Sequence, residues 1–257
     1  MILSRRVSLG GVYLDEIDES IVIRSVDPGV PHESVTAVNR MGGAGQRVTG
    51  QHWETLEVTV AYGIDLPKRK LAERRAVFDA VNAWANRAGW LRVNWLPGKR
   101  LYVDKAVLAS SGDLWRWTDE HQLTFRAYNV PFWQDETATQ ASGELGAAGT
   151  VGLEVPGTVR TVLDATFQNR SGKEVTRFSL AAGNCTISLT GLNLSGSGKL
   201  EISHGTDGLL RITADGVSVY SKYTGADDLY VDPGSVSASY SADRAGVLSV
   251  SCFGRYV

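Results

Sequence analysis

Cysteine is scarce in this sequence, and long hydrophobic runs are missing. Its 257 residues include two Cys and two Met, and no Trp follows Trp133. No uninterrupted apolar stretch reaches the roughly 20 residues of a transmembrane helix. The first residues show neither the apolar core nor the cleavage site of a signal peptide. We therefore expect a protein that is made and folded in the cytoplasm and is not inserted into a membrane.

An excess of charge of one sign is also missing. Lys and Arg number 26 and Asp and Glu number 28, which gives a formal net charge of -2. This balance creates no general field that would attract nucleic acid or an anionic membrane. One basic cluster opens a helical segment: Lys68, Arg69, Lys70, Arg74 and Arg75. Because no basic strand or aromatic stacking motif accompanies it, we favour a solvated or interface helix face and expect no nucleic-acid partner.

The two cysteines, Cys185 and Cys252, both fall in the second half of the chain. Each occupies the apolar side of an alternating strand pattern, so buried free thiols are the favoured interpretation. A disulfide between them is the alternative, although the fold does not need one.

Motifs that carry catalysis or cofactor binding are absent from the sequence. No serine has the G-x-S-x-G frame of a nucleophile elbow. Gly196–Lys199 lacks the first glycine of a phosphate loop and indicates a hairpin turn. Gly42–Gly45 leads into a strand instead of a helix, which favours a flexible loop over a dinucleotide site. We therefore expect neither an enzyme nor a cofactor; an unrecognised enzyme, such as a glycoside hydrolase built on Asp119 and Glu120, is the weakest alternative.

Metal-binding patterns are equally sparse. The histidines are scattered singly, without the spacing that brings two imidazoles to one metal: His32, His52, His121 and His204. The acidic segment Asp15–Ser20 lacks the glycine and the spacing of a calcium loop and is interpreted as a charged turn. Asp227 and Asp228 leave a calcium site as a minor alternative. The sequence predicts no metal.

The distribution of Trp indicates a domain boundary. All seven Trp residues lie between Trp53 and Trp133. Pro131 ends the last strand of the Trp-containing half, and the residues after it become small and polar. The length suits two domains of about 100–150 residues each. We predict a first domain over 1–136, an exposed linker over 137–149 and a second domain over 150–257.

The first domain is predicted to be α+β, with several strands and one long helix. Residues 56–62 alternate between apolar and polar, as do parts of 90–95, 100–108 and 122–127. Residues 68–89 follow Pro67, end at a glycine and carry apolar residues at helical spacing. The expected buried stripe combines these positions: Leu71, Val77, Phe78, Val81, Trp84, Ala85 and Ala88.

The second domain reads as short alternating strands separated by Gly, Asn, Ser and Asp turns. Such strands are predicted at 163–168, 185–189, 210–213 and 248–252, and no stretch has helical periodicity. The simplest fold that accommodates these strands is a β-sandwich of jelly-roll type. The fold class of the chain as a whole is therefore mainly β.

The order of these elements resembles one family, the distal tail proteins (Dit) of long-tailed, non-contractile bacteriophages and their prophage relatives. The likeness covers the chain, from the hairpin region 7–27 and the glycine-rich loop and strand 43–64 to the aromatic strands 90–107 and 123–133. It includes the helix with Arg75, Phe78 and Trp84, and the final β-sandwich that ends in GRYV. No catalytic motif contributes to it.

The resemblance implies a structural function in the virion tail tip. In that family the first domain has a tail-tube-like β-sandwich fold and forms a hexameric ring, and the second is a galectin-like β-sandwich. The implied function is a baseplate hub that joins the tail tube to the host-adsorption apparatus. Its implied partners are other copies of the chain, the tail-tube protein and tail-tip proteins.

Self-assembly is also expected from the residues themselves. Seven Trp residues provide more aromatic area than the core of one domain can easily enclose. A Trp that remains at the surface often marks an interface. A ring would also cover exposed strand edges. The candidate interface residues lie in the N-terminal hairpin and after the glycine-rich loop: Arg5, Arg6, Tyr13, Arg47, His52 and Trp53.

A carbohydrate-binding host-adsorption module is the competing function. The second domain has no Trp, and the tyrosines that could form a ligand platform are Tyr223 and Tyr230. In a regular strand Tyr220 and Tyr223 would lie on opposite faces, which leaves at most one of them for a platform. We therefore favour a second domain that binds or spaces proteins, with carbohydrate binding as the alternative.

Overall fold

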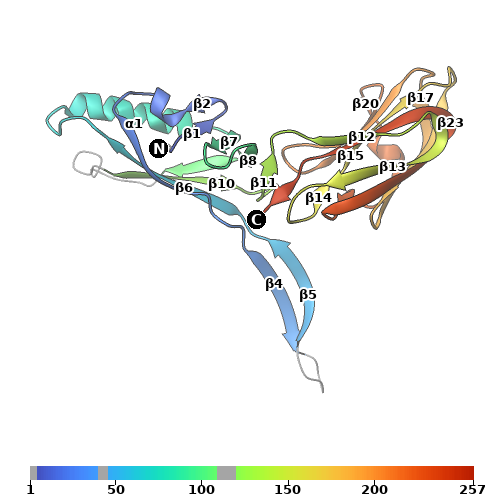
Figure 1. The fold of residues 1–257 in the computed structure, drawn as a ribbon, viewed down its shortest axis with the longest axis horizontal. Helices are drawn as coiled ribbons and strands as arrows, with labels where there is room; N and C mark the ends of the chain where they lie inside the picture. The colour runs from blue at the N-terminus through green and yellow to red at the C-terminus, as the bar shows by residue number, and fades with distance from the viewer. Residues whose placement is uncertain (1–4, 40–45, 109–119) are drawn as a thin grey trace. The chain divides into compact units, whose positions relative to one another are not determined.

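The computed structural model describes residues 5–39, 46–108 and 120–257 of the chain. They form two compact units that divide between Trp133 and Gln134. Figure 1 shows strands throughout and one long helix, so the mainly β fold predicted from the sequence is confirmed. None of the helices in these residues is long and apolar enough to cross a membrane.

The first unit contains helix α1 (Leu71–Ala85), a short 3₁₀ helix (Leu14–Glu16) and strands that are mostly antiparallel neighbours in the sheets. Those strands are β1 (Val7–Leu9), β2 (Val12–Tyr13), β3 (Ile21–Asp27), β4 (Glu33–Asn39), β5 (Gln46–Trp53), β6 (Leu56–Ile64), β7 (Gly89–Val93), β8 (Lys99–Val103), β9 (Lys105–Leu108) and β10 (His121–Ala127). One sheet has the order β3-β6-β10-β9, a second contains β2-β1-β7-β8, and β4 pairs with β5 alone. Strand β11 (Trp133–Asp135) spans the division between the units.

Strand β6 lies between β3 and β10 in its sheet and is paired on both edges. Its register with β10 runs from Leu56, opposite Ala127, to Tyr62, opposite His121. Leu56, Val58 and Val60 are fully buried, as the alternating sequence predicts for one face of a strand. The strand predicted over 56–62 is thus confirmed and extends to Ile64.

Helix α1 is shorter than predicted, but most of its predicted buried stripe is confirmed. It begins at Leu71 and ends at Ala85, whereas the sequence predicted a helix over 68–89. Leu71 is exposed, while Val77, Val81 and Trp84 are buried. The observed stripe therefore keeps the predicted positions Val77, Val81, Trp84 and Ala85 and loses Leu71.

Arg74 also belongs to the buried stripe, although the sequence predicted that it lies on a basic outer face. Arg74 is fully buried. Its Nη1 donates hydrogen bonds to the carbonyl oxygens of Ile64, at 3.0 Å, and Leu66, at 2.7 Å. These carbonyls lie where the chain leaves β6 and need a donor once they are buried. Because Arg counts as a polar residue in the apolar periodicity of a helix, the sequence pattern could not show that these carbonyls need Arg74 as a donor.

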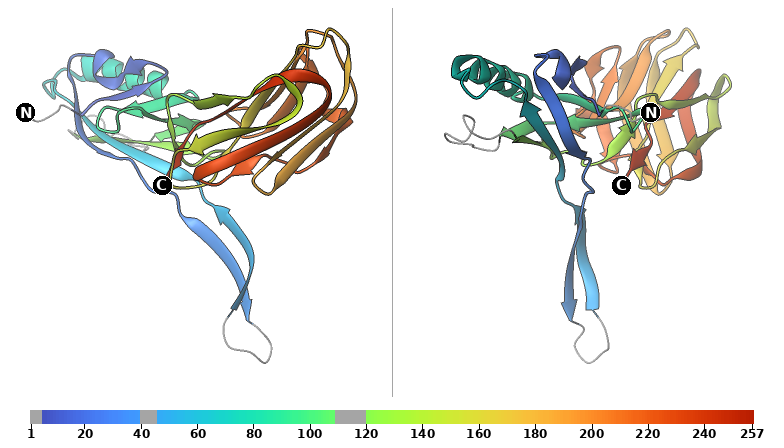
Figure 2. Two further views of the ribbon diagram at one scale, coloured as in Figure 1. Left: turned by 45° about the vertical axis from the view of Figure 1, so that its right-hand side comes forward. Right: turned by 60° about the vertical axis from the view of Figure 1, so that its left-hand side comes forward.

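The second unit consists of strands and a short 3₁₀ helix (Tyr220–Lys222). Its strands are β12 (Thr139–Ser142), β13 (Gly146–Val155), β14 (Thr161–Val162), β15 (Asp164–Asn169), β16 (Val175–Ala182), β17 (Cys185–Leu194), β18 (Lys199–His204), β19 (Leu210–Ala214), β20 (Val217–Ser218), β21 (Tyr223–Gly225), β22 (Tyr230–Val231), β23 (Gly234–Cys252) and β24 (Arg255–Tyr256). The long sheet has the order β20-β19-β18-β15-β23-β16-β17-β21, with β12 and β13 also paired to β23. Figure 2 shows how strongly this sheet curls.

Strand β23 organises the second unit because it pairs with four other strands. Its 19 residues pair with β12, β13, β15 and β16 along different parts of their length. Aromatic side chains from β15, β16 and β23 meet in the core: the Phe167 ring lies 5.0 Å from that of Phe178 and 5.8 Å from that of Tyr240, centroid to centroid.

The linker predicted over 137–149 is wrong. Strand β12 and the start of β13 occupy this segment and pair with β23, with Thr139 opposite Cys252 and Ala148 opposite Ser241. Gly149 packs close to the Tyr240 ring, where an added Cβ would lie 3.0 Å from a ring carbon. The small, polar composition reflects strands with exposed side chains, whose backbone hydrogen bonds are supplied by a partner roughly 90 to 115 residues further along the chain.

Both cysteines are free, as the favoured interpretation predicted. Cys252 is buried, and burial raises the pKa of its thiol to about 11, with further contributions from the carboxylates of Asp164 and Asp135. Cys185 is only half-buried, at the start of β17, so the predicted burial holds fully for one thiol and in part for the other.

We expect the two thiols to differ in reactivity. In native protein at pH 8, DTNB should modify Cys185 and leave Cys252 unmodified, because Cys252 is buried and hardly ionised. Both should react after denaturation without reductant. The variant Cys185→Ser serves as the matched control and should show no native reaction. Equal native rates at the two sites, or no reaction after denaturation, would contradict the assignment.

Candidate functional site

The β4–β5 hairpin is a ribbon that pairs with no other strand of the described chain. Its register runs from Glu33, opposite Trp53, to Asn39, opposite Gln46. Figure 1 and both views of Figure 2 show it extending away from the other strands of the first unit. A lone two-stranded ribbon is only marginally stable in water, so this hairpin needs stabilising contacts from elsewhere.

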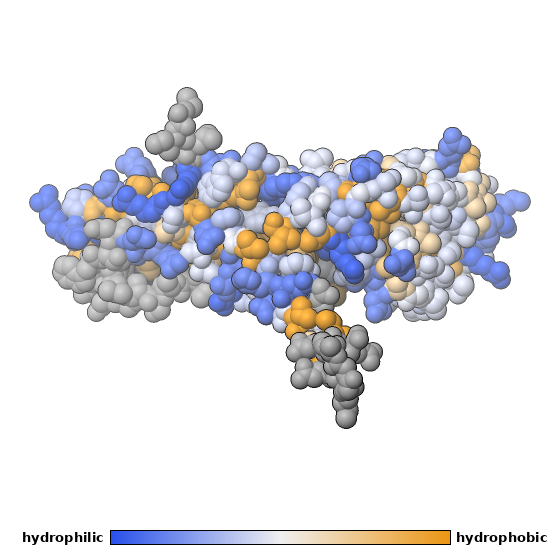
Figure 3. Space-filling model, turned by 60° about the horizontal axis from the view of Figure 1, so that its bottom comes forward, coloured by the Kyte–Doolittle hydropathy of each residue, from blue (hydrophilic) through white to orange (hydrophobic). Residues whose placement is uncertain are grey.

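Apolar side chains are exposed on both faces of the hairpin. Val35, Val38 and Val48 are 50%, 49% and 56% exposed. The register pairs Ala37 with Val48, so Val35, Ala37 and Val48 share one face and Val38 lies on the other. Figure 3 shows hydrophobic surface on the hairpin where it leaves the unit. These valines were not among the residues predicted from the sequence, although the alternation in ESVTAVN is typical of a strand.

The root of the hairpin is held by the segment that follows β10. The Trp53 ring packs edge-on against Phe132, with 5.3 Å between centroids. The Trp133 indole Nε1 donates to the carbonyl oxygen of Pro28 at 3.2 Å. The amide of Glu54 donates to the carbonyl oxygen of His32 at 2.8 Å. Three separate contacts thus fix where the two strands leave the unit.

A glycine is required where the chain turns from β3 into the hairpin. Gly29 has φ of 63°, in the left-handed region, and its amide donates to Asp27 Oδ1 at 3.0 Å. A Cβ at this position would collide with the carbonyl oxygen of Glu57. The backbone of β6 therefore lies directly against the turn, and only glycine allows this approach.

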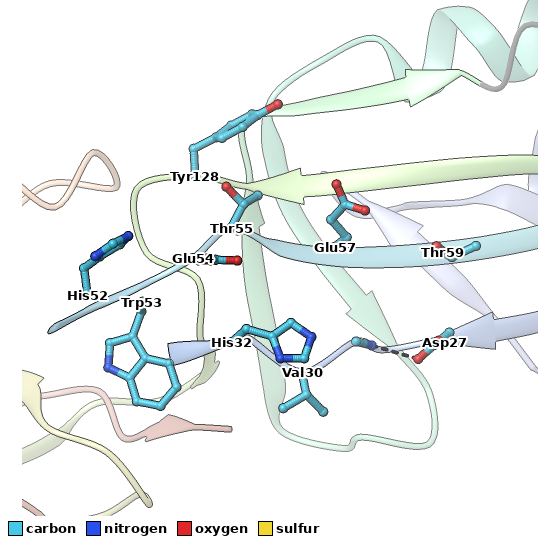
Figure 4. Close-up of a pocket in the computed structure, with 11 residues that line it drawn as sticks. Asp27, Val30, His32, His52, Trp53, Glu54, Thr55, Glu57, Thr59 and Tyr128 are labelled. Atoms are coloured by element: carbon cyan, nitrogen blue, oxygen red, sulfur yellow. Dashed lines mark hydrogen bonds between the residues drawn. The ribbon is translucent and has the colours of Figure 1, made fainter. Parts of the chain in front are cut away.

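A cleft of about 900 Å³ opens beside the hairpin root (Figure 4). In Figure 4 His52 and Trp53 come from the end of β5, and Glu57 from the start of β6, with the Tyr128 ring nearby. Among the described residues that line it, the carboxylates are those of Asp27, Glu54 and Glu57, and none is Lys or Arg. The cleft is therefore acidic and partly aromatic.

The three carboxylates differ in what they bind. The Glu57 carboxylate pairs with Arg126, with Nε 2.7 Å from Oε1. Asp27 accepts the Gly29 amide. Glu54 is exposed, and within the described residues no hydrogen bond or ion pair engages its carboxylate. Glu54 is thus the acidic group of the cleft that is available to a partner.

Two of the predicted interface residues, Arg6 and Tyr13, are brought together at the N-terminal hairpin. The Arg6 guanidinium lies 3.9 Å from the centre of the Tyr13 ring. It also donates from Nε to Asp15 Oδ2 at 2.8 Å and from Nη2 to Glu16 Oε1 at 2.8 Å. These hydrogen bonds, first to Asp15 and then to Glu16, raise the pKa of Arg6. Its interactions are therefore satisfied within its own chain.

The other predicted interface residues lie elsewhere. His52 and Trp53 line the cleft, and the backbone of Arg47 pairs with Val38 in the hairpin. The side chain of Arg47 lies outside what the structure describes. Arg5 donates from Nη1 to the carbonyl oxygen of Arg24 at 3.0 Å. The six residues thus fall into two groups, one at β1 and β2 and one on the hairpin.

The Trp residues do not supply the exposed aromatic surface expected from their number. Of the five within the described residues, Trp84 and Trp133 are buried and Trp53, Trp90 and Trp95 are half-buried. Trp115, Trp117 and the glycine-rich loop at 42–45 lie outside the described residues. Within the described residues, the exposed large apolar side chains of this unit are mostly aliphatic, and three of them are valines of the hairpin.

In the second unit the predicted arrangement of Tyr220 and Tyr223 is wrong. Residues Tyr220–Lys222 form a 3₁₀ helix, which brings the two rings together with 5.3 Å between centroids and 38° between planes. Tyr220 is 49% exposed, and Tyr223 is half-buried behind it. The prediction assumed a regular strand, in which adjacent odd and even positions face opposite ways.

A buried histidine that the sequence did not single out lies near the other candidate, Tyr230. The His204 side chain is 2% exposed, with Nδ1 2.9 Å from Asp164 Oδ1 and Nε2 3.4 Å from Asp228 Oδ1. Burial and then the Asp228 carboxylate raise the pKa of Tyr230. Among the described residues, no group of three or more His, Cys, Asp or Glu is arranged to hold a metal. The Asp228 carboxylate therefore lies beside the His204 ring.

The fold, a mainly β unit with one long helix followed by an all-β unit, is similar to that of a solved phage hub protein. The chain is similar to the SPP1 Dit protein, described as a paradigm of the hub adsorption apparatus in phages that infect Gram-positive bacteria. The TM-score is 0.67 over 98% of this chain and 99% of that one, at 11% identity. The resemblance inferred from the order of elements is therefore confirmed as a likeness of fold.

Two further solved structures are similar over nearly the whole chain. They are the phage p2 baseplate in its activated conformation with Sr and with Ca, at TM-scores of 0.47 and 0.43 and identities of 9% and 8%. Scores at this level carry no weight for the fold. No protein-family model matches the chain, and no curated protein matches its sequence.

The close approach at Gly29 can be tested by substitution. Gly29→Ala should lower the free energy of unfolding of the first unit by about 3 kcal/mol or more, because it adds a backbone collision to left-handed strain. Gly98→Ala is the matched control: Gly98 has φ of 72° but open space around its Cβ position. Its cost should be about 1–2 kcal/mol.

Urea denaturation followed by Trp fluorescence suits this comparison, because every Trp lies between residues 53 and 133 and reports on the first unit. Equal losses of stability at the two glycines would show that β6 does not press against the turn.

Proposed function

We propose that the chain is a structural subunit of a phage tail, and that its first unit assembles with other copies into a ring that forms the baseplate hub. The likeness of fold to the SPP1 Dit hub protein supports the proposal. The observation that carries it is the exposed, unpaired β4–β5 hairpin. In this proposal the ring is hexameric, as the family resemblance implies, and lies at the tail tip between the tail-tube protein and the tail-tip proteins.

The hairpin favours assembly for two physical reasons. Its exposed valines would gain on the order of 3 kcal/mol in total if a neighbour covered them. Its outer edges also present backbone N–H and C=O groups that another chain can pair with. A soluble monomer rarely keeps such a strand pair uncovered, whereas a closed ring with one repeated contact covers it in every copy.

The proposal predicts that the full chain assembles and that the hairpin valines are needed. Light scattering coupled to size-exclusion chromatography should show a discrete oligomer. The double variant Val35→Asp with Val48→Asp places charge on one face of the ribbon. It should raise the concentration at half-assembly at least about tenfold, because the buried apolar contact is replaced by two charges that must be desolvated.

A matched control is Val217→Asp, which changes a valine in β20 of the second unit that is more exposed than Val35 or Val48. It should leave assembly unchanged. A wild-type chain that stays monomeric at high concentration would rule out self-assembly, and normal assembly of the double variant would rule out the hairpin as its basis.

A second candidate function is carbohydrate binding by the second unit, favoured by the stacked pair of Tyr220 and Tyr223. An exposed ring backed by a second ring provides an apolar face for a sugar, which the sequence alone argued against. If this function holds, full-length protein should bind insoluble cell-wall polysaccharide in a pull-down, and Tyr220→Ala should reduce that binding at least about tenfold.

Tyr128→Ala is the control for this experiment, since Tyr128 is a comparably exposed tyrosine of the first unit. If both variants bind the polysaccharide equally well, Tyr220 is not part of a binding platform. The proposal for this unit would then be the role favoured from the sequence, in which it binds or spaces proteins.

A further inference from the structure

The cleft at the hairpin root presents negative charge in an aromatic setting. The described residues of its lining carry three carboxylates; that of Glu57 is paired with Arg126, whereas the Glu54 carboxylate has no partner within the described residues. The rings of Trp53 and Tyr128 border the same space. Carboxylates beside aromatic faces suit a guanidinium or a lysine stem, which can pair and stack at once.

A basic segment of the same chain lies exposed between β6 and α1. Lys68, Arg69 and Lys70 are consecutive and exposed. Lys70 is paired with Glu73, Nζ to Oε2 at 2.7 Å, and Glu73 is the acidic residue of the first helical turn. No interaction within the described part of the chain engages the Arg69 guanidinium. Positive charge at a helix N-terminus opposes the helix dipole, so an anionic partner would stabilise this segment.

Strand β6 keeps the two surfaces apart within one copy. The cleft is built at its first residues, and the basic segment follows its last residue, Ile64. Nine residues of strand span about 30 Å at roughly 3.3 Å per residue. Figure 1 shows the hairpin at one end of β6 and the start of α1 at the other. The two charged surfaces can therefore meet only between different copies.

We propose that the acidic cleft of one copy receives the basic segment Lys68–Lys70 of a second copy, with Arg69 facing Glu54. This contact rests on the proposed ring and names the surfaces by which its copies bind. It is heterologous, because the two surfaces differ and lie at opposite ends of the unit. One such contact repeated from copy to copy closes into a ring. The charges orient each copy relative to the next, while the hairpin valines supply apolar burial.

Charge reversal tests the contact in the full-length protein. Glu54→Lys alone and Arg69→Glu alone place like charges together, and each should raise the concentration at half-assembly at least about tenfold. The double variant restores opposite charges in swapped positions and should return to within about threefold of wild type. Light scattering measures assembly, and Trp fluorescence in urea checks that both exposed substitutions leave folding unchanged.

Matched controls are Glu154→Lys and Arg177→Glu, exposed residues of the second unit that should not affect assembly. A second measurement uses wild-type protein prepared separately with ¹⁴N and ¹⁵N. The two preparations are mixed, allowed to assemble and crosslinked with a carbodiimide. It should join Glu54 to Lys68 or Lys70, with mixed-isotope peptides showing that the link is between copies.

The possible results distinguish a failure of this contact from a failure of the proposed ring. A wild-type ring whose single variants assemble normally would overturn this contact and leave the proposed function intact. Weakened single variants without rescue in the double variant would also overturn it, since the two residues would then not be partners. A wild-type chain that never assembles would overturn the ring and the contact together.

Discussion

Strand β6 is paired on both edges, and that pairing positions the other features of the first unit. At its start the Glu57 carbonyl lies against the turn at Gly29 and fixes the root of the hairpin. At its end Arg74 binds the carbonyls of Ile64 and Leu66, where the chain turns toward helix α1. The hairpin, the cleft and the basic segment are therefore spaced by one rigid element.

The second unit depends on a single long strand in a similar way. Strand β23 supplies backbone partners to β12 and β13, whose small residues could not form a stable sheet by themselves. It also places Tyr240 against Phe167 in the core. In both units short or weakly apolar strands are ordered by one well-paired neighbour, which explains how a sequence rich in Gly, Ser and Thr forms so much sheet.

In the proposed ring, the surfaces of the first unit would contribute two kinds of interaction. The exposed valines of the hairpin offer apolar area but little directional preference, because burial is roughly proportional to area. The acidic cleft and the basic segment offer little net energy at a solvated surface but a strong preference for one orientation. Together they suit a contact that must repeat with the same geometry in every copy.

The sequence by itself determined the elements whose pattern is local. The alternation around Val58 and Val60 gave β6, the helical spacing around Val81 gave α1, and the absence of helical spacing after residue 150 indicated an all-β second unit; their order was enough to indicate the Dit-like fold. These features depend on which face of an element is apolar, and neighbouring residues encode that directly.

The tertiary structure determined the features that depend on contacts between residues far apart in the sequence. Arg74 is buried because carbonyls at the end of β6 need a donor, and residues 139–149 are strands because β23 lies beside them. Tyr220 and Tyr223 stack because the backbone turns there. Of the predicted interface residues, His52 and Trp53 line the cleft, but Glu54, between them and β6, was missed. A cleft is formed by segments that meet only in the fold, so no local pattern in the sequence could show its charge.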